Sequence, residues 1–317
     1  MATVTRQVWD GSEIYTLENR SFSISVIPEV GSNVFRMRDK IAERDVLRAP
    51  DGLEQLKAKP VHYGIPLLLP PCRTRRGTFQ YEGREYRLEI NTPDGHHSHG
   101  FLRGRPWRVK DASAANGRAA LVTEFDTNDF PELLSQYPHR LQIEAETALD
   151  GDSLVQTFTI GNLSETNAPI GFGLHTWFML DATPDAWTLR LPVEDIWELD
   201  AELMPNGNRL PLDRYASLIN GMNLQGQDMD MVFRIGNRPA EAVLERPGYS
   251  IRYSAEGPFT QWVVYTRGPV SDTICLEPLT WTPDAPNVKA DPALTGLRAI
   301  EPGGEWKLRV RMDIERR

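Results

Sequence analysis

The sequence predicts an all-β protein built as a large antiparallel β-sandwich. The first observation is a period-2 alternation of apolar and polar residues, which recurs along the chain and is typical of strands that bury one face. The second is an abundance of turn residues, with 24 glycines and 24 prolines among 317 residues and no low-complexity run. Because so many short strands must close or stack their sheets, a sandwich is favoured.

The individual elements follow from local patterns. Alternation is clearest in residues 22–26, 141–149, 154–160 and 306–314, each of which predicts a strand with one solvated face. Short turns at Glu82-Gly83 and at Arg246-Pro247-Gly248 predict hairpins that join 78–81 to 84–88 and 242–245 to 249–254. The best helical candidate is 129–137, where Asp129 would cap the helix and Pro131 would lie in its first turn.

The organisation of the chain is simple. No composition break, linker or internal repeat divides it, so residues 1–317 are predicted to form a single domain. The chain has no window of 18 apolar residues, its first residues lack an apolar stretch, and its two cysteines form no CxxC pair. We therefore expect a cytoplasmic protein without a disulfide framework or a structural zinc site.

Charge narrows the range of partners. The chain carries 44 acidic and 35 basic side chains and a net charge of -9, which argues against nucleic acid or an anionic membrane surface as the main partner. A small neutral ligand fits better. The oligomeric state stays open.

Two polar clusters lie in loops or turns. In residues 70–77, Arg73 follows a buried apolar run, and its guanidinium could donate hydrogen bonds into a pocket; the alternative is a solvated turn with three arginines. In residues 94–100, His96, His97 and His99 are candidate metal ligands, but their spacing matches no common zinc signature. A loop of ordinary exposed histidines is the alternative there.

A third pair of segments holds one ionisable residue each. His175 in 171–178 and Glu277 in 274–281 are both flanked by apolar residues on predicted strands. Burial raises the pKa of a carboxyl group and lowers that of an imidazole, which brings both toward neutrality, where acid–base catalysis is efficient. Together they suggest an acid and a base; separately, each could be a satisfied core group.

Several blocks of the sequence resemble the aldose 1-epimerase (mutarotase) family, over nearly the whole chain. The matching blocks are Tyr63-Gly-Ile-Pro-Leu-Leu-Leu-Pro-Pro-Cys-Arg73, His99-Gly-Phe-Leu-Arg-Gly-Arg-Pro-Trp107, Gly173-Leu-His-Thr-Trp-Phe178, Asp230-Met-Val-Phe233 and Ile274-Cys-Leu-Glu-Pro-Leu-Thr-Trp-Thr-Pro-Asp-Ala-Pro-Asn287. The resemblance implies a β-supersandwich that interconverts the α and β anomers of a sugar, with no cofactor and no metal. It implies His175 as the general acid for the ring oxygen and Glu277 as the general base for the C1 hydroxyl.

The same resemblance assigns the remaining site residues. His99 would hydrogen-bond the ring-oxygen side of the sugar, and Arg73 and Asp230 would hold its hydroxyls. Trp177 could stack on the apolar face of a pyranose, with a core tryptophan as the alternative.

The chain departs from the family pattern at Cys72, Gly95-His96 and Thr176-Trp177, where asparagine, paired asparagines and Pro-Tyr are expected. These changes concern the pocket wall, so they leave the identity of the sugar open.

Other functions remain possible on the same residues. One is a sugar-binding or regulatory protein on the same fold. Another is a hexose-6-phosphate 1-epimerase, because Arg73, Arg75, Arg76, Arg103 and Arg105 could supply a phosphate site. A glycoside hydrolase or lyase is disfavoured, since Glu277 has no evident carboxylate partner.

The two cysteines give a geometric expectation. Cys275 and Glu277 are two apart on a predicted strand and therefore share a face, which should be the pocket side. If Arg73 faces the sugar from extended backbone, Cys72 should turn toward the core, and Cys275 should then react faster with thiol reagents.

Overall fold

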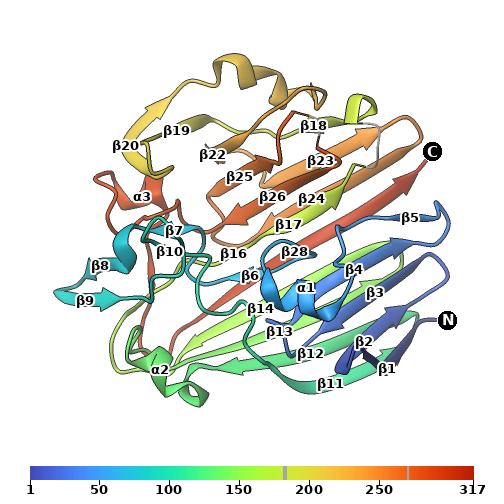
Figure 1. Cartoon of the computed structure of the whole chain (residues 1–317), viewed down its shortest axis with the longest axis horizontal. Helices are drawn as coiled ribbons and strands as arrows, with labels where there is room; N and C mark the ends of the chain where they lie inside the picture. The colour runs from blue at the N-terminus through green and yellow to red at the C-terminus, as the bar shows by residue number, and fades with distance from the viewer. Residues whose placement is uncertain (181–183, 270) are drawn as a thin grey trace.

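A computed structural model of the chain describes residues 1–180, 184–269 and 271–317 (Figure 1). Within these ranges, strands dominate and pair antiparallel, so the predicted all-β class is confirmed. No helix in the described ranges is long and apolar enough to cross a membrane.

The largest sheet has nine strands. In spatial order they are β11 (Arg108–Ala115), β12 (Arg118–Asp126), β13 (Leu141–Asp150), β14 (Ser153–Asn162), β28 (Glu305–Arg316), β24 (Tyr249–Glu256), β23 (Glu241–Arg246), β18 (Thr188–Arg190) and β21 (Met222–Asn223). In β28 the side chains of Leu308, Val310, Met312 and Ile314 are buried, and the charged residues between them are not. The period-2 stretches 141–149, 154–160 and 306–314 are therefore strands, as predicted.

A second sheet of eight strands holds the candidate site. It consists of β20 (Pro205–Leu210), β19 (Asp195–Leu199), β22 (Asp230–Arg234), β25 (Gln261–Thr266), β26 (Thr273–Leu279), β16 (Gly173–Leu174) and β6 (Leu67–Leu68), with β17 (Thr176–Met179) also paired to β26. Every residue of β26 is buried. A polar side chain on this strand is therefore kept from bulk water.

A third sheet comprises β1 (Thr3–Trp9), β2 (Ser12–Glu18), β3 (Phe22–Ile27), β4 (Asn33–Asp39) and β5 (Arg44–Asp45). It and the eight-stranded sheet pack against the nine-stranded sheet. Tyr253 of β24 contacts Phe178 of β17 and Trp262 of β25, with ring centroids 5.5 and 5.9 Å apart, and Ser32 hydrogen-bonds Thr123 of β12 at 2.7 Å. One apolar cluster joins residues of all three sheets, which confirms the predicted sandwich.

Short elements fill the connections between the sheets. They are α1 (Leu53–Ala58), β7 (Arg73–Thr74), η1 (Arg75–Gly77), β8 (Thr78–Tyr81), β9 (Arg84–Arg87), β10 (His97–Ser98), η2 (Thr127–Asp129), α2 (Pro131–Leu134), β15 (Ala168–Pro169), η3 (Pro184–Ala186), η4 (Asp213–Ile219), α3 (Pro292–Thr295) and β27 (Ala299–Ile300). The hairpins β8–β9 and β23–β24 form at the predicted turns.

The helix predicted for residues 129–137 is shorter than expected. Only α2 is helical there; Pro131 lies in its first turn, but Phe130 and not Asp129 occupies the N-cap position. The reason is that Asp129 belongs to the preceding 3-10 turn, which Asp126 caps by accepting a hydrogen bond from the Asn128 N–H.

Candidate active site

The centre of the site is a buried pair, His175 and Glu277. Pairing of Gly173 with Leu279 and of Thr176 with Leu276 sets a register that places His175 opposite Glu277, in the gap between β16 and β17. Nε2 of His175 lies 3.3 Å from Oε1 of Glu277, and the two residues are 6% and 2% exposed. Proton exchange between the two groups therefore needs no movement of the backbone.

Burial governs the protonation of this pair. Desolvation lowers the pKa of His175 to about 3, with the positive charge of a protonated His62 as a second cause. Desolvation raises the pKa of Glu277 well above its ordinary value, and the charge of Asp230 adds to this; hydrogen bonds from the thiols of Cys72 and Cys275 and the charge of Arg73 act in the opposite direction. Both shifts disfavour the charged forms. The pair is therefore suited to share one titratable proton, which is held by either His175 or Glu277.

A small two-stranded sheet carries Arg73 and His99 to the same place. In the β7–β10 pair, Arg73 lies opposite Ser98, and the His99 N–H donates to the Cys72 carbonyl at 2.8 Å. The His99 ring meets the His175 ring edge-on, with centroids 4.8 Å apart. Desolvation, with the neighbouring charges of His175 and Arg103, lowers the pKa of His99 well below its ordinary value.

Asp284, which follows β26 of the eight-stranded sheet, holds the segment of β7 in place. Its N–H donates to the Arg73 carbonyl at 2.9 Å, and its carboxylate accepts a hydrogen bond from the Arg75 N–H at 3.0 Å. Asp284 is only 4% exposed. It is part of the matching segment 274–287, but its positioning role had no local signal in the sequence, because both of its partners lie about 200 residues earlier.

These segments enclose a cavity of about 250 Å³. This lies just below the range of about 300–1,000 Å³ common for small-molecule sites, so it suits a ligand of the size of one sugar ring. The six residues that the family resemblance assigned to the site all line the cavity, namely Arg73, His99, His175, Trp177, Asp230 and Glu277. The full lining is Val61, His62, Cys72, Arg73, Ser98, His99, His175, Trp177, Leu199, Leu203, Asp230, Val232, Val263, Tyr265, Glu277 and Pro283.

Strand register explains part of this lining that the sequence did not reveal. Across the sheet, Glu277 pairs with Val263 and Val263 with Val232, while Cys275 pairs with Tyr265 and Tyr265 with Asp230. Side chains directly opposite in a sheet share a face. Glu277 therefore lies in a cross-strand row with the apolar residues Val263 and Val232. Tyr265 and Asp230 lie in a second row beside it.

Trp177 forms a wall of the cavity. It is 1% exposed, and its indole N–H donates to the Val61 carbonyl at 2.8 Å. Its ring packs near His175 and, edge-on, against Tyr265, with centroids 5.5 and 5.7 Å away. Protein contacts therefore set its orientation before any ligand binds.

Each of the two thiols lies near a different carboxylate oxygen of Glu277. Sγ of Cys275 is 3.8 Å from Oε1, so the predicted shared face of Cys275 and Glu277 is confirmed. Cys72, however, does not turn to the core: its Sγ is 3.8 Å from Oε2 of Glu277, and it lines the cavity. The expectation was wrong because Cys72 has left-handed backbone, with φ of 53°, so strand alternation does not apply there.

The three histidines of the 94–100 loop do not converge. His96 and His97 are 0% and 1% exposed, which contradicts the reading of all three as exposed loop residues. Nδ1 of His96 accepts a hydrogen bond from the Arg76 N–H at 3.1 Å, and Nδ1 of His97 lies 2.8 Å from the Glu89 carbonyl. Burial lowers the pKa of His97 to about 4. Of the three, only His99 reaches the cavity.

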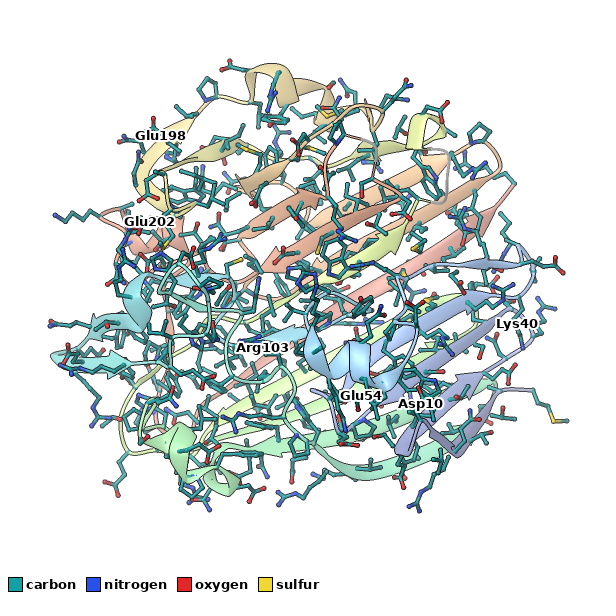
Figure 2. The ribbon with its side chains drawn as sticks, viewed as in Figure 1. Asp10, Lys40, Glu54, Arg103, Glu198 and Glu202 are labelled. Carbon is teal, nitrogen blue, oxygen red and sulfur yellow. The ribbon has the colours of Figure 1, made fainter. Side chains whose placement is uncertain are left out.

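Most arginines considered for a phosphate site are already paired. Arg75 forms ion pairs with Asp200 and Glu202, Arg76 pairs with Glu202 at 2.8 Å, and Arg105 pairs with Glu132. Glu202 and Arg103 are labelled in Figure 2.

Arg73 and Arg103 differ from these arginines. Both border a second cavity of about 460 Å³, which shares Arg73, His99 and three further residues with the first. Nε of Arg73 is buried without a hydrogen bond and lies 4.0 Å from Asp94, and Nε of Arg103 donates to the Gly100 carbonyl. They are the two arginines of this group that face open space.

Comparison with known proteins agrees with this architecture. The profile of the family Aldose 1-epimerase matches residues 13–313. An uncharacterized protein of Escherichia coli K12, YihR, is 24% identical over 236 residues, which are 73% of each chain. A second uncharacterized protein of that organism, YphB, is 24% identical over 78% of this chain and 83% of its own.

Solved structures show the same fold at low identity. A galactose mutarotase-like protein from Clostridium acetobutylicum superposes with a TM-score of 0.93 at 22% identity, covering 99% of this chain and 98% of that one. Galactose 1-epimerase from Lactobacillus acidophilus superposes with a TM-score of 0.78 at 17% identity, covering 100% and 99%.

Proposed function

Because the chain belongs to the aldose 1-epimerase family, we propose that it interconverts the α and β anomers of an aldose in the cavity above Glu277 and His175. The observation that carries this proposal is the buried contact of 3.3 Å between Nε2 of His175 and Oε1 of Glu277. Both atoms belong to groups on the cavity wall, so each can reach one of the two oxygens bonded to the anomeric carbon.

The chemistry follows from the single proton of this pair. When the proton is on His175, Glu277 is a carboxylate that can take the proton of the C1 hydroxyl, while His175 gives its proton to the ring oxygen. The bond between C1 and the ring oxygen breaks, and C1 becomes a carbonyl carbon. Glu277 now holds the proton and His175 is neutral, so the pair carries one proton before and after the step.

Ring closure reverses these transfers after rotation about the C1–C2 bond. The other face of the carbonyl is then attacked, and the opposite anomer forms. In this proposal His99 hydrogen-bonds the ring-oxygen side of the sugar and Arg73 and Asp230 hold its hydroxyls; it is supported by the position of all three residues on the cavity wall. The sequence of proton transfers needs no cofactor.

The test is the rate of anomer equilibration of a panel of aldoses, followed by polarimetry or by saturation-transfer NMR. We expect at least one sugar to equilibrate faster than in buffer alone. If none does, yet a sugar binds, the chain is a sugar-binding protein on the same fold.

A second candidate, a hexose-6-phosphate 1-epimerase, is supported by Arg73 and Arg103 at the second cavity. A phosphate there could accept hydrogen bonds from two guanidinium groups while the ring occupies the first cavity. The panel should therefore include hexose 6-phosphates beside the free hexoses. Preference for the phosphorylated sugars would favour this candidate.

A further inference from the structure

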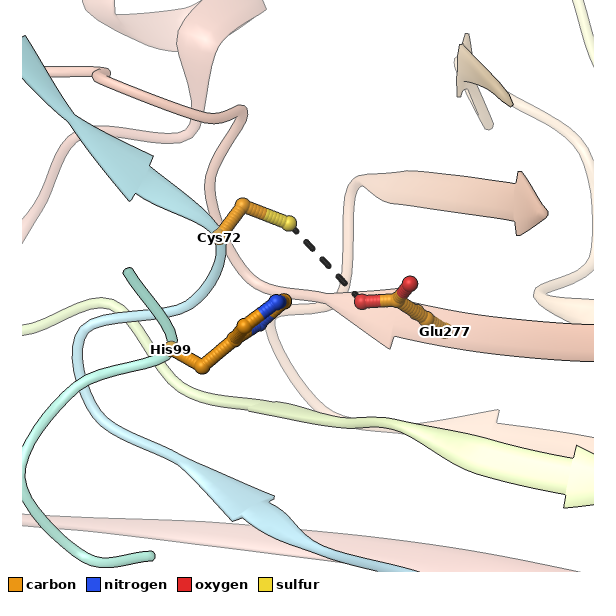
Figure 3. Close-up of side chains that lie close together, drawn as sticks. All are labelled: Cys72, His99 and Glu277. Carbon is orange, nitrogen blue, oxygen red and sulfur yellow. Dashed lines mark hydrogen bonds between the residues drawn. The ribbon is translucent and has the colours of Figure 1, made fainter. Parts of the chain in front are cut away.

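Three side chains with different metal-ligating atoms meet at the cavity: Cys72, His99 and Glu277 (Figure 3). One ligand atom from each, a sulfur, an imidazole nitrogen and a carboxylate oxygen, lies within 4.8 Å of the other two. The Cys72 Sγ to Glu277 Oε2 distance is 3.8 Å. The residues come from three segments far apart in sequence, so the fold alone brings them together.

These separations fit one tetrahedral ion. Zinc bonds to sulfur at about 2.3 Å, to imidazole nitrogen at about 2.0–2.1 Å and to carboxylate oxygen at about 2.0–2.2 Å, so two ligand atoms at a tetrahedral angle lie roughly 3.5 Å apart. The 3.8 Å between sulfur and oxygen is close to this value. The other two separations are at most 4.8 Å, so the three side chains would move closer together on binding one ion.

The site is reachable from the cavity, and its thiol and carboxyl groups can give up protons to a bound cation. All three residues line the cavity, and Asp230 lines it as well. Nδ1 of His99 is buried and has no hydrogen-bond partner among the described residues. A bound divalent cation would favour the ionised forms of Glu277 and of the neighbouring Asp230, of which only Glu277 would be a ligand. Three protein ligands would leave a fourth position open toward the cavity.

A second set of possible ligands, His175, Cys275 and Glu277, shares the same carboxylate. It is less suited to an incoming ion, because Cys275 is 0% exposed and does not line the cavity. In addition, Cys275 Sγ already lies 3.0 Å from Nδ1 of His175. An ion entering from the cavity meets Cys72 and His99 first.

We propose that Cys72, His99 and Glu277 form a binding site for a thiophilic divalent cation such as Zn²⁺, and that the bound ion blocks the sugar site. Binding forms bonds from the ion to the thiolate, the imidazole and the carboxylate. Any proton on the Cys72 thiol or the Glu277 carboxyl is released to solvent. The inhibitory part of this inference rests on the proposed function, because it removes Glu277 as a base; the binding part does not.

Cobalt(II) is a suitable probe for the binding part, since a thiolate ligand produces an intense charge-transfer band in the near ultraviolet. Titration of the purified, chelator-treated protein with Co²⁺ should produce this band and saturate at one ion per chain, and Zn²⁺ should abolish it. The Cys72→Asn variant keeps a hydrogen-bond donor beside Glu277 but lacks the thiol, so it should show no band. The Cys275→Ser variant is the matched control and should retain it.

Wild-type protein provides a test that needs no variant. Alkylation followed by peptide mapping should show that one equivalent of Zn²⁺ protects Cys72. The site is overturned if wild-type protein gives no cobalt band, if the band persists in Cys72→Asn, if it disappears only in Cys275→Ser, or if Zn²⁺ leaves alkylation of Cys72 unchanged.

Activity then separates the two proposals. If sugar equilibration is catalysed, Zn²⁺ at saturation of the cobalt-defined site should lower the rate at least tenfold, and a chelator should restore it. A cobalt band without any catalysis would remove the proposed function and leave the metal site. Catalysis without a cobalt band would remove the metal site and leave the proposed function. Full activity with the metal site saturated would refute the blocking role.

Discussion

Sγ of Cys275 lies 3.0 Å from Nδ1 of His175, while the other ring nitrogen, Nε2, lies 3.3 Å from Oε1 of Glu277. The thiol of Cys275 is also placed to donate to Oε1 of Glu277 at 3.8 Å. If the sulfur accepts a hydrogen bond from Nδ1–H, then Nε2 is the nitrogen that exchanges a proton with the carboxylate. We assign this tautomer from the hydrogen-bond network. Cys275 is then a positioning residue for the pair.

Replacing Cys275 tests that role. Cys275→Ala removes both contacts, so we expect kcat to fall by about 10-fold, the lower end for a group that orients a catalytic residue, with KM little changed. Cys275→Ser can still donate and accept, and should recover much of the loss. The measurement is the rate of sugar equilibration over a range of concentrations. Equal kcat values for the two variants would show that Cys275 only fills space.

The acid and the base should each be needed. Glu277→Gln preserves shape but cannot take a proton, and His175→Asn cannot give one, so each should lower turnover by roughly 10²–10⁴-fold. Both residues are buried, so their substitution can disturb folding. Near-ultraviolet circular dichroism of each variant is therefore the control for a native fold. Rates within a few-fold of wild type in both variants would refute the assignment.

Arg103 should discriminate neutral from phosphorylated sugars. Arg103→Gln removes a charge at the second cavity, so it should raise KM for a hexose 6-phosphate by about 10-fold or more and change the kinetics of a free hexose little, if the anionic group binds there. Arg105→Gln is the matched control, because Arg105 is already paired with Glu132. A hexose 6-phosphate that responds equally to both substitutions would speak against an anion subsite.

The thiols should differ in reactivity in the reverse order to that expected from strand alternation. Cys72 lines the cavity and is 8% exposed, whereas Cys275 is 0% exposed. We therefore expect an alkylating reagent to label Cys72 first, and a bound sugar to slow this labelling. Peptide mapping after timed exposure is the measurement. Faster labelling of Cys275 would contradict the position of the Cys72 thiol.

A buried ion pair between Asp39 and Arg316, neither of which lines the cavity, should contribute to the stability of the protein against acid. Asp39 is 0% exposed, and Nε of Arg316 donates to its carboxylate at 2.9 Å. Burial alone would raise the pKa of Asp39, but hydrogen bonds from Arg316 and from the N–H groups of Ala42 and Ile41 outweigh it and hold the pKa below its ordinary value. The stabilisation is thus complete above the unfolded pKa and is lost as pH falls through the lower, folded pKa.

Arg316→Gln should lower the free energy of unfolding at pH 7 by about 3 kcal/mol, because it leaves a buried carboxylate without its charged partner. It should also move the acid transition to higher pH, since the folded pKa of Asp39 rises. Urea unfolding at several pH values measures both. Arg317→Gln, at an exposed ion pair with Glu315, should change stability by less than about 0.5 kcal/mol. Equal effects of the two substitutions would contradict the argument.

Local pattern determined much of the fold. Alternation in residues 306–314 and the turn at Glu82-Gly83 predicted β28 and the β8–β9 hairpin, because side-chain period and turn chemistry are properties of neighbouring residues. Flanking apolar residues likewise indicated that His175 and Glu277 would be buried. The resemblance to the aldose 1-epimerase family drew attention to the residues that line the cavity, while their individual roles stay predictions.

Only the tertiary structure decided which groups meet. Register across separate strands places His175 opposite Glu277, and a left-handed backbone turns Cys72 toward that carboxylate instead of the core. Arg75 is removed from the candidates for a phosphate site by Asp200 and Glu202, more than 100 residues away. Contacts of this kind depend on how distant segments pack, and no local period or turn signal encodes them.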